Sequence, residues 1–482
     1  MCKYNSSMTK FNFFSLLILA LFYNTTNIFS QNEVISIDIQ KYDYLKSESY
    51  KIKTIEINGN KRTKKDIILR ELSIKEDEII DKNIIISKVE EDKRKLINTN
   101  LFNEVDINII LLDDNNLSIE INLIESFYLL PSIIFELSDR NFNDWWVNFD
   151  HDFSRINYGG GFLQYNLTGR ADILEFTFRR GFIRELYSSY YIPYLSKKQK
   201  GGLEANFNLI EFDHLFYNTN NYVPVFYKSD NFLKKHLKSS IEYSHRESFY
   251  NYHYFNVEYN NIKLNDTLSF LNENYFRNDK NINGISLGYE FNRDFRDIKN
   301  YPLDGFRLNF KIRKDGIGIF KNLDKWSTKI YYSNYIPLNK KFNYSFNLST
   351  LYSSKNLPFL FYESSDKIRG YEKYLIHGYS YFIQKNSLKK KILTTSFSRE
   401  NEKLMKRVKN IPLDIYLKIF FDSGVIWKYS KQTNDSYLNN KYLYSYGIGV
   451  DIVTLKNISF SCEYSRNSLN ENNLSFKLGA DF

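Results

Sequence analysis

The sequence predicts a transmembrane antiparallel β-barrel of about 16 strands, preceded by one small α+β domain. The first observation is a period-two alternation of apolar and polar residues that recurs from about residue 131 to the last residue, 482. The second is a composition with 40 Tyr and 40 Phe, residues that favour strands. The third is a mean hydropathy of −0.47, which excludes a bundle of membrane helices. It does not exclude a barrel, because half of each barrel strand faces a polar lumen.

Residues 1–30 are expected to be a secretory signal peptide, followed by a linker over 31–50. Lys3 and Lys10 precede an apolar stretch from Phe11 to about Tyr23, and a small residue, Ser30, stands at a plausible cleavage site. The apolar stretch is shorter than the about 20 residues that a transmembrane helix needs.

Residues 51–125 read as one compact α+β domain with the order β-α-α-β-β. A strand over 51–58 is followed by helices over 64–72 and from about 82 to 98, the second with Asp81 as a candidate N-cap. Two further strands, 105–112 and 117–124, are joined by an Asp-Asp-Asn-Asn turn typical of a hairpin.

Residues 126–482 are expected to form the barrel. Alternation is clearest over 174–179, 285–292, 306–313, 342–349 and 474–482. A soluble β-sandwich also alternates, but here the pattern continues to the end of the chain without a helical break. Barrel strands of about 9–11 residues give roughly 14 to 16 strands in this length, and the number should be even. The pair Trp145-Trp146 is expected to anchor at the periplasmic interface.

The composition argues against several other classes of protein. The net charge of +10 is spread over the chain without a Lys/Arg block, so no nucleic acid is expected as a partner. Two cysteines exclude a disulfide scaffold, a zinc ribbon and an iron–sulfur site. No H-E-x-x-H, C-x-x-C or G-x-S-x-G motif occurs. We therefore expect no catalytic residue, no metal and no cofactor.

Four local motifs occur in a fixed order within the predicted barrel. They are Asp294-Phe295-Arg296-Asp297 with Tyr301-Pro302-Leu303-Asp304-Gly305; Ile368-Arg369-Gly370-Tyr371; Phe420-Phe421-Asp422-Ser423-Gly424-Val425-Ile426-Trp427; and Gly447 with Gly449. The chain ends in an aromatic residue, Phe482, as a C-terminal barrel signal does. Together these resemble the outer-membrane assembly-factor superfamily of the BamA/TamA type, and residues 51–125 are similar to the periplasmic POTRA domain of that superfamily.

Two features depart from the family pattern. The family usually places an acidic residue in the strand after the R-G-Y loop, where this chain has Lys389-Lys390-Lys391. The chain also shows only one POTRA-like unit, whereas the main bacterial assembly factor has several.

The resemblance implies that Arg369, at the tip of a loop folded back into the lumen, is locked to Asp422 on a barrel strand. An arginine inside a lumen must be paired or solvated, and its planar fork can engage a carboxylate through two hydrogen bonds. Gly370 permits the tight backbone and Tyr371 packs the tip against the wall. The alternative for Arg369 is an exposed loop arginine.

For the motif of Asp294, Arg296 and Asp297, a purely structural role is an alternative to a functional one. It is a charged turn that Pro302 and Gly305 fix, without a direct role in transport.

The resemblance implies a barrel that inserts, assembles or translocates client polypeptides. Its expected partners are unfolded clients bound at a POTRA edge strand, outer-membrane lipid and lipopolysaccharide, and other subunits of an assembly complex. A passive pore or receptor with a periplasmic adaptor is the alternative, and a barrel-borne hydrolase is a third. The sequence leaves open the client, and whether the chain inserts proteins, secretes a soluble one or exports lipid.

Overall fold

The computed structural model describes residues 45–478, apart from 140–141, 197–199, 249, 277–279, 299–300, 318–322, 356, 365–367, 399–409, 429–436 and 455–457. The predicted signal peptide, most of the predicted linker and the predicted C-terminal signal Phe482 lie outside these residues. Within this part of the chain, no helix is long and apolar enough to cross a membrane.

The N-terminal domain consists of β1 (Ser49–Asn58), α2 (Lys65–Glu71), β2 (Ile79–Asp81), α3 (Lys82–Asn98), β3 (Phe102–Asp113) and β4 (Asn116–Glu125). Its sheet has the order β2-β1-β4-β3, with β1 parallel to β4. The predicted element order is therefore right except for the short β2. Asp81 caps α3 by accepting a hydrogen bond from the Asn83 amide at 2.8 Å. Alternate residues of β1, β3 and β4 pack with both helices into one apolar core.

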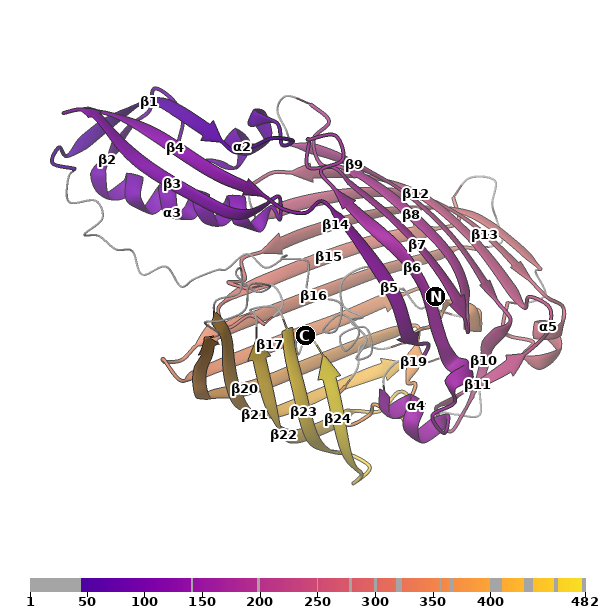
Figure 1. Ribbon diagram of the computed structural model, residues 1–482. Coiled ribbons are helices and arrows are strands. Elements are labelled where there is room, and N and C mark those ends of the chain that lie inside the picture. Colours follow the sequence, from indigo (N-terminus) through magenta and orange to yellow (C-terminus); the bar gives the residue numbers. More distant parts are fainter. Residues whose placement is uncertain are drawn as a thin grey trace.

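In the described part of the chain the barrel sheet contains sixteen strands, an even number as the sequence predicts. They are β5 (Leu129–Leu137), β6 (Ile156–Tyr165), β7 (Ile173–Gly181), β8 (Arg184–Ile192), β9 (Gly201–Phe212), β12 (Lys234–Arg246), β13 (Asn251–Leu264), β14 (Asn281–Asp294), β15 (Gly305–Asp315), β16 (Lys325–Pro337), β17 (Phe342–Ser353), β20 (Ser380–Ser398), β21 (Asn410–Trp427), β22 (Leu443–Thr454), β23 (Ile458–Asn467) and β24 (Asn472–Leu478). Every neighbouring pair of strands is antiparallel, and the pairs follow the chain order. The sheet curls round from β5 to β24 (Figure 1).

The distribution of side chains across this sheet is the reverse of that in a soluble protein. Large apolar residues are exposed on the outer face, among them Val257, Ile419, Ile448 and Leu474. Buried positions on the inner face hold polar or charged residues such as Glu258, Lys418, Asp451 and Ser475. An apolar exterior around a polar interior suits a sheet that faces lipid on one side only.

The sheet ends at β5 and β24, and we call the boundary between them the seam. In the part of the chain that the structure describes, β5 pairs only with β6, and β24 only with β23. The first and last strands therefore leave one edge each without a ladder partner.

The helix α4 (Phe142–Asn148) lies at the end of the barrel opposite to the N-terminal domain (Figure 1). Strand β5 begins directly after that domain and runs away from it, so the residues that follow β5 are at the far end. The prediction that Trp145-Trp146 anchors at the periplasmic interface is therefore wrong. The pair is close to the N-terminal domain in sequence, but the full length of β5 separates the two in space.

Connections between strands pack across the far mouth of the barrel. Between β9 and β12 the hairpin β10 (His214–Asn220) and β11 (Val223–Lys228) carries Tyr222 at its tip. The fully buried Tyr222 hydroxyl accepts a hydrogen bond from the Leu438 amide at 2.8 Å, in the connection after β21. Six strands separate β12 from β21 in the sheet. The hairpin therefore crosses the mouth.

A second layer of this cover comes from two other connections. Helix α5 (Thr267–Leu271) and the 3₁₀ turn η3 (Phe359–Phe361) share an apolar cluster. The Phe359 amide also donates to the Asn274 carbonyl at 2.9 Å.

Candidate functional site

The connection between β17 and β20 folds back into the barrel and places its tip against the last strands. Gly370 has φ +86°, a backbone conformation that favours glycine. Its carbonyl accepts hydrogen bonds from the side-chain amides of Asn467, at 2.9 Å, and Asn473, at 2.7 Å. The Tyr371 hydroxyl lies 2.6 Å from that of Ser468. The tip is thereby bound to the hairpin of β23 and β24.

Arg369 and Asp422 form a buried ion pair with side chains 2% and 0% exposed. The arginine donates from Nε to Oδ2 at 2.8 Å and from Nη2 to Oδ1 at 2.5 Å, the two-pronged geometry that its planar fork permits. A third bond runs from the Arg369 backbone amide to Oδ2 at 3.1 Å.

The remaining guanidinium surface is also occupied. Nη1 donates to the Ser387 hydroxyl at 3.0 Å and Nη2 to the Asn386 carbonyl at 3.1 Å. The ring of Phe420 lies 4.0 Å from the guanidinium carbon, a cation–π distance. Arg369 is therefore not an exposed loop arginine.

Sequence reasoning missed a second carboxylate in this site. Glu463 on β23 lies 3.6 Å from Arg369 Nη1 and forms an ion pair with Lys418 Nζ at 2.8 Å. Lys418 also contacts Asp451 at 2.6 Å, and these three side chains are fully buried. The strand after the loop, β20, carries Lys389 where the family pattern has an acidic residue, and the second carboxylate near Arg369 comes from β23. Alternation could have found Lys418, because it lies two residues from Phe420 and four from Asp422 on the inward face of β21.

The two glycines of β22 make room for this network. A Cβ on Gly447 would lie 2.5 Å from Cζ of Phe420, and one on Gly449 would lie 2.7 Å from Cε of Lys418. Both distances are too short for a side chain. The glycine-bearing strand therefore lets Phe420 and Lys418 cross the inner wall toward Arg369 and Glu463.

The other predicted motif forms a self-contained turn between β14 and β15. Arg296 donates to Asp294 through Nε and Nη2, both at 2.8 Å. Asp297 accepts from the amide of Leu303 at 3.1 Å. Gly305 has φ +91°, and a Cβ there would lie 2.1 Å from the Phe295 carbonyl oxygen.

The structure does not bring Asp294, Arg296 and Asp297 to the loop tip, but it does bring a neighbour. Tyr301, next to the buried Pro302, donates from its hydroxyl to Asp451 at 2.8 Å, and Lys389 Nζ lies 4.2 Å from the centre of its ring. The network is therefore continuous from this turn to Arg369.

The N-terminal domain is held to the adjacent barrel end by polar contacts. Glu71, at the end of α2, accepts from Arg246 of β12 at 3.1 Å. Arg62 donates to the Leu167 carbonyl at 2.6 Å, in the turn between β6 and β7. These contacts fix the orientation of the domain at the barrel entrance.

Comparison with known proteins agrees with this architecture. The Omp85 superfamily domain matches residues 166–482, and the POTRA family, described as surface antigen variable number repeat, matches residues 50–125. The outer membrane protein assembly factor BamA of Neorickettsia risticii is 30% identical over 147 residues, which are 30% of this chain and 18% of that protein.

Two solved structures share the fold. BamA from Haemophilus ducreyi lacking POTRA domains 1–3 has a TM-score of 0.56 at 16% identity, covering 89% of this chain and 84% of that one. CdiB from Escherichia coli has a TM-score of 0.55 at 12% identity, covering 89% and 76%.

The superfamily match extends over well more than half of the chain, and the POTRA match lies N-terminal to it. The barrel accordingly lies in the outer membrane with its POTRA domain in the periplasm, and the covered mouth is the extracellular one. The chain belongs to the Omp85 superfamily.

Proposed function

We propose that this protein assembles client polypeptides into the outer membrane, receiving them on its POTRA domain and releasing them at the barrel seam. The observation that carries this proposal is the combination of a blocked mouth with an open seam. The hairpin at Tyr222 crosses the lumen exit, while β5 and β24 each keep an edge without a ladder partner among the described strands.

The seam supplies what an extended client needs inside a membrane. Unpaired backbone groups are costly in lipid, so a client strand gains by pairing with an exposed sheet edge. Burial of its apolar side chains in the bilayer adds to this driving force. The reaction requires no nucleotide, and we propose that the protein acts without catalytic residues or a cofactor of its own.

The POTRA domain offers an earlier pairing edge. Strand β3 spans twelve residues and, among the described strands, lies beside β4 at the edge of the sheet. An unfolded client in the periplasm would add there as a further strand. Other assembly subunits and lipopolysaccharide remain proposed partners.

We propose that the Arg369–Asp422 pair keeps the loop tip docked to the strands nearest the seam. The tip contacts β21, β22 and the β23–β24 hairpin, so releasing it would leave the inner face of the last strands without support. This is a positioning role.

Depletion of the protein followed by proteomics of the outer membrane and of the culture medium tests the proposed function. We expect several barrel proteins to fall together in the membrane, and the full-length gene to restore them. A gene lacking residues 51–125 should yield an inserted barrel that does not restore client levels. Loss of one secreted protein with an unchanged membrane would instead indicate translocation, and no change in either fraction would refute both.

The second candidate, a passive pore, is tested on the purified protein in planar bilayers. The packed loops predict no stable open channel. A long-lived large conductance in the intact chain would favour the pore.

A further inference from the structure

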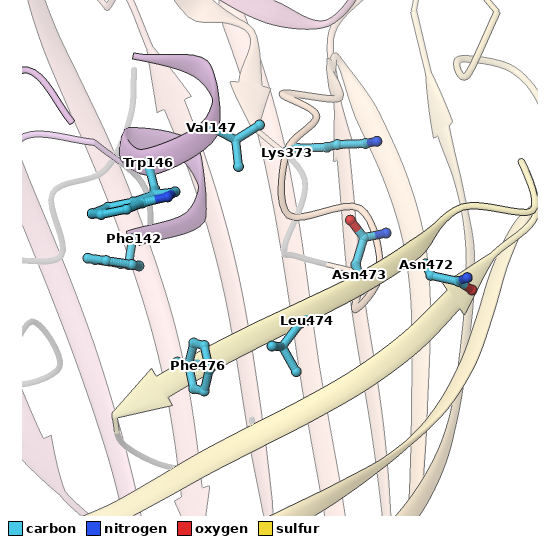
Figure 2. A pocket seen from close by; sticks show the side chains of 8 residues that line it. All are labelled: Phe142, Trp146, Val147, Lys373, Asn472, Asn473, Leu474 and Phe476. Carbon is cyan, nitrogen blue, oxygen red and sulfur yellow. The ribbon is translucent and has the colours of Figure 1, made fainter. Parts of the chain in front are cut away.

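A cavity of about 450 Å³ lies at the extracellular end of the seam, between α4 and β24 (Figure 2). Phe142, Trp146 and Val147 line it from the helix, and Leu474 and Phe476 from the last strand. A polar rim completes it, formed by Lys373, Asn472 and Asn473.

This cavity opens on the lipid side of the barrel wall. Along β24, Ser475 is buried and faces the lumen, while Leu474 and Phe476 alternate with it and are 51% and 45% exposed. The cavity is therefore continuous with the apolar outer belt. The three α4 side chains that face it are exposed in the structure as well.

The helix that forms the other wall is firmly anchored. The Trp145 indole donates to the Asp152 carbonyl at 2.9 Å, and the Asn148 amide to the Lys373 carbonyl at 3.1 Å. The stacked rings of Trp146 and Phe142, 5.5 Å between centres, add rigidity to the cavity side of α4. A wall held in this way does not collapse onto β24, and the five apolar side chains that line the cavity favour an apolar ligand.

We propose that this cavity binds one hydrocarbon chain of an outer-leaflet membrane lipid. Its continuity with the lipid-facing belt identifies the source, because acyl chains surround the belt on all sides. The rim does not select a charged headgroup, since Lys373 is paired with Glu471 at 3.0 Å. The bound hydrocarbon chain fills the space between the β5–β6 connection, which holds α4, and β24, where the described strands form no ladder across the seam.

Native mass spectrometry of the full chain in detergent, titrated with phosphatidylglycerol or with phosphatidylcholine of the same chains, tests the proposal. We expect one retained lipid per protein, with equal affinity for the two headgroups. Leu474→Asn should weaken retention about tenfold, because it places an amide in an apolar contact. The matched control is Ile448→Asn on β22, a lipid-facing position that is 60% exposed and lies outside the cavity.

Graded retention of several lipids, or equal weakening by Leu474→Asn and Ile448→Asn, would show only ordinary lipid around the belt and overturn the proposal. Retention of phosphatidylglycerol but not of phosphatidylcholine would overturn the proposal that the cavity recognises the hydrocarbon chain of the lipid. If Leu474→Asn fails to fold, Val147→Asn on α4 replaces it with the same expectation.

A second measurement locates the bound hydrocarbon chain of the lipid. Phosphatidylcholine brominated in its acyl chains should quench tryptophan fluorescence with a saturable component that Trp146→Phe removes. A saturable component that survives in Trp146→Phe would place the bound lipid elsewhere.

Discussion

Reversing the charge of Arg369 should release the loop tip from the barrel wall. Arg369→Asp would place a third carboxylate beside Asp422 and Glu463 in a fully buried site. Removing one partner of a buried ion pair costs about 3–5 kcal/mol, and the added repulsion favours the upper part of that range. At about 1.4 kcal/mol per tenfold change in the equilibrium constant, the undocked population should rise by a factor on the order of 10³.

Trypsin cleavage after Lys373 reports this population, because the residue follows the tip and is partly protected in the docked state. When docking is fast relative to cleavage, the cleavage rate follows the undocked fraction. We expect Arg369→Asp and Asp422→Arg each to accelerate cleavage strongly. The double swap should recover about 1–3 kcal/mol of coupling.

The matched control is Arg313→Asp on β15. Arg313 is another inward arginine, paired with Glu258 at 2.6 Å, and the structure shows no bond from it to the described residues of the loop, 368–379. It should leave cleavage at Lys373 unchanged. The reasoning is refuted if the double swap is no better than the worse single variant, or if the control accelerates cleavage as much as Arg369→Asp does.

Three further outcomes follow from the structure. Gly447→Ala should destabilise the barrel by about 1–3 kcal/mol, because its Cβ would lie 2.3 Å from the Tyr464 carbonyl oxygen and 2.5 Å from Phe420. The loss should appear as a lower temperature for heat-modified migration on gels. Gly284→Ala, with nothing within 4 Å of its Cβ, should not lower that temperature. Tyr128 packs in the apolar core of the N-terminal domain, and burial raises its pKa above the ordinary value of 10.0 to about 12. Its neutral hydroxyl should therefore contribute fully to the stability of that domain below pH 10, and the contribution should be lost as the pH rises toward 12. The helical circular dichroism signal should show this loss of stability between pH 10 and pH 12, and the loss should be smaller in Tyr128→Phe. Arg246→Ala should loosen the POTRA domain against the barrel, because its contact with Glu71 is lost while those at Arg62 and its neighbours remain, and should raise the spread of spin-label distances between domain and barrel. An unchanged spread would show that the Arg246–Glu71 contact does not hold the domain.

The elements were largely predictable because they depend on local patterns. Alternation gave the strands, and an Asp at a helix N-cap gave the start of α3. Short elements without a strong period, such as β2 and α4, were not found. The pairing of Arg369 with Asp422 came from motif resemblance rather than from spacing.

The contacts across strands were not predictable from one sequence. Glu463 meets Lys418 only because the strand registers and the curl of the sheet bring β21 and β23 to the same level. A shift of one residue would turn either side chain to the lipid. Inward charges could have been proposed from alternation, but their partners could not.

The binding surface of the loop tip has a consequence for the order of events in biogenesis. The tip is encoded at residues 368–371, whereas the groups that hold it lie mostly downstream, at Asp422, Asn467 and Asn473. The tip can meet Asp422 once β21 is in place, but it gains its hydrogen bonds from Asn467 and Asn473 only with the final hairpin of the chain. Full docking then marks completion, since a barrel that lacks its last strand lacks a hydrogen-bond donor to Gly370. A truncated or stalled chain would hold this loop less tightly than a finished molecule does.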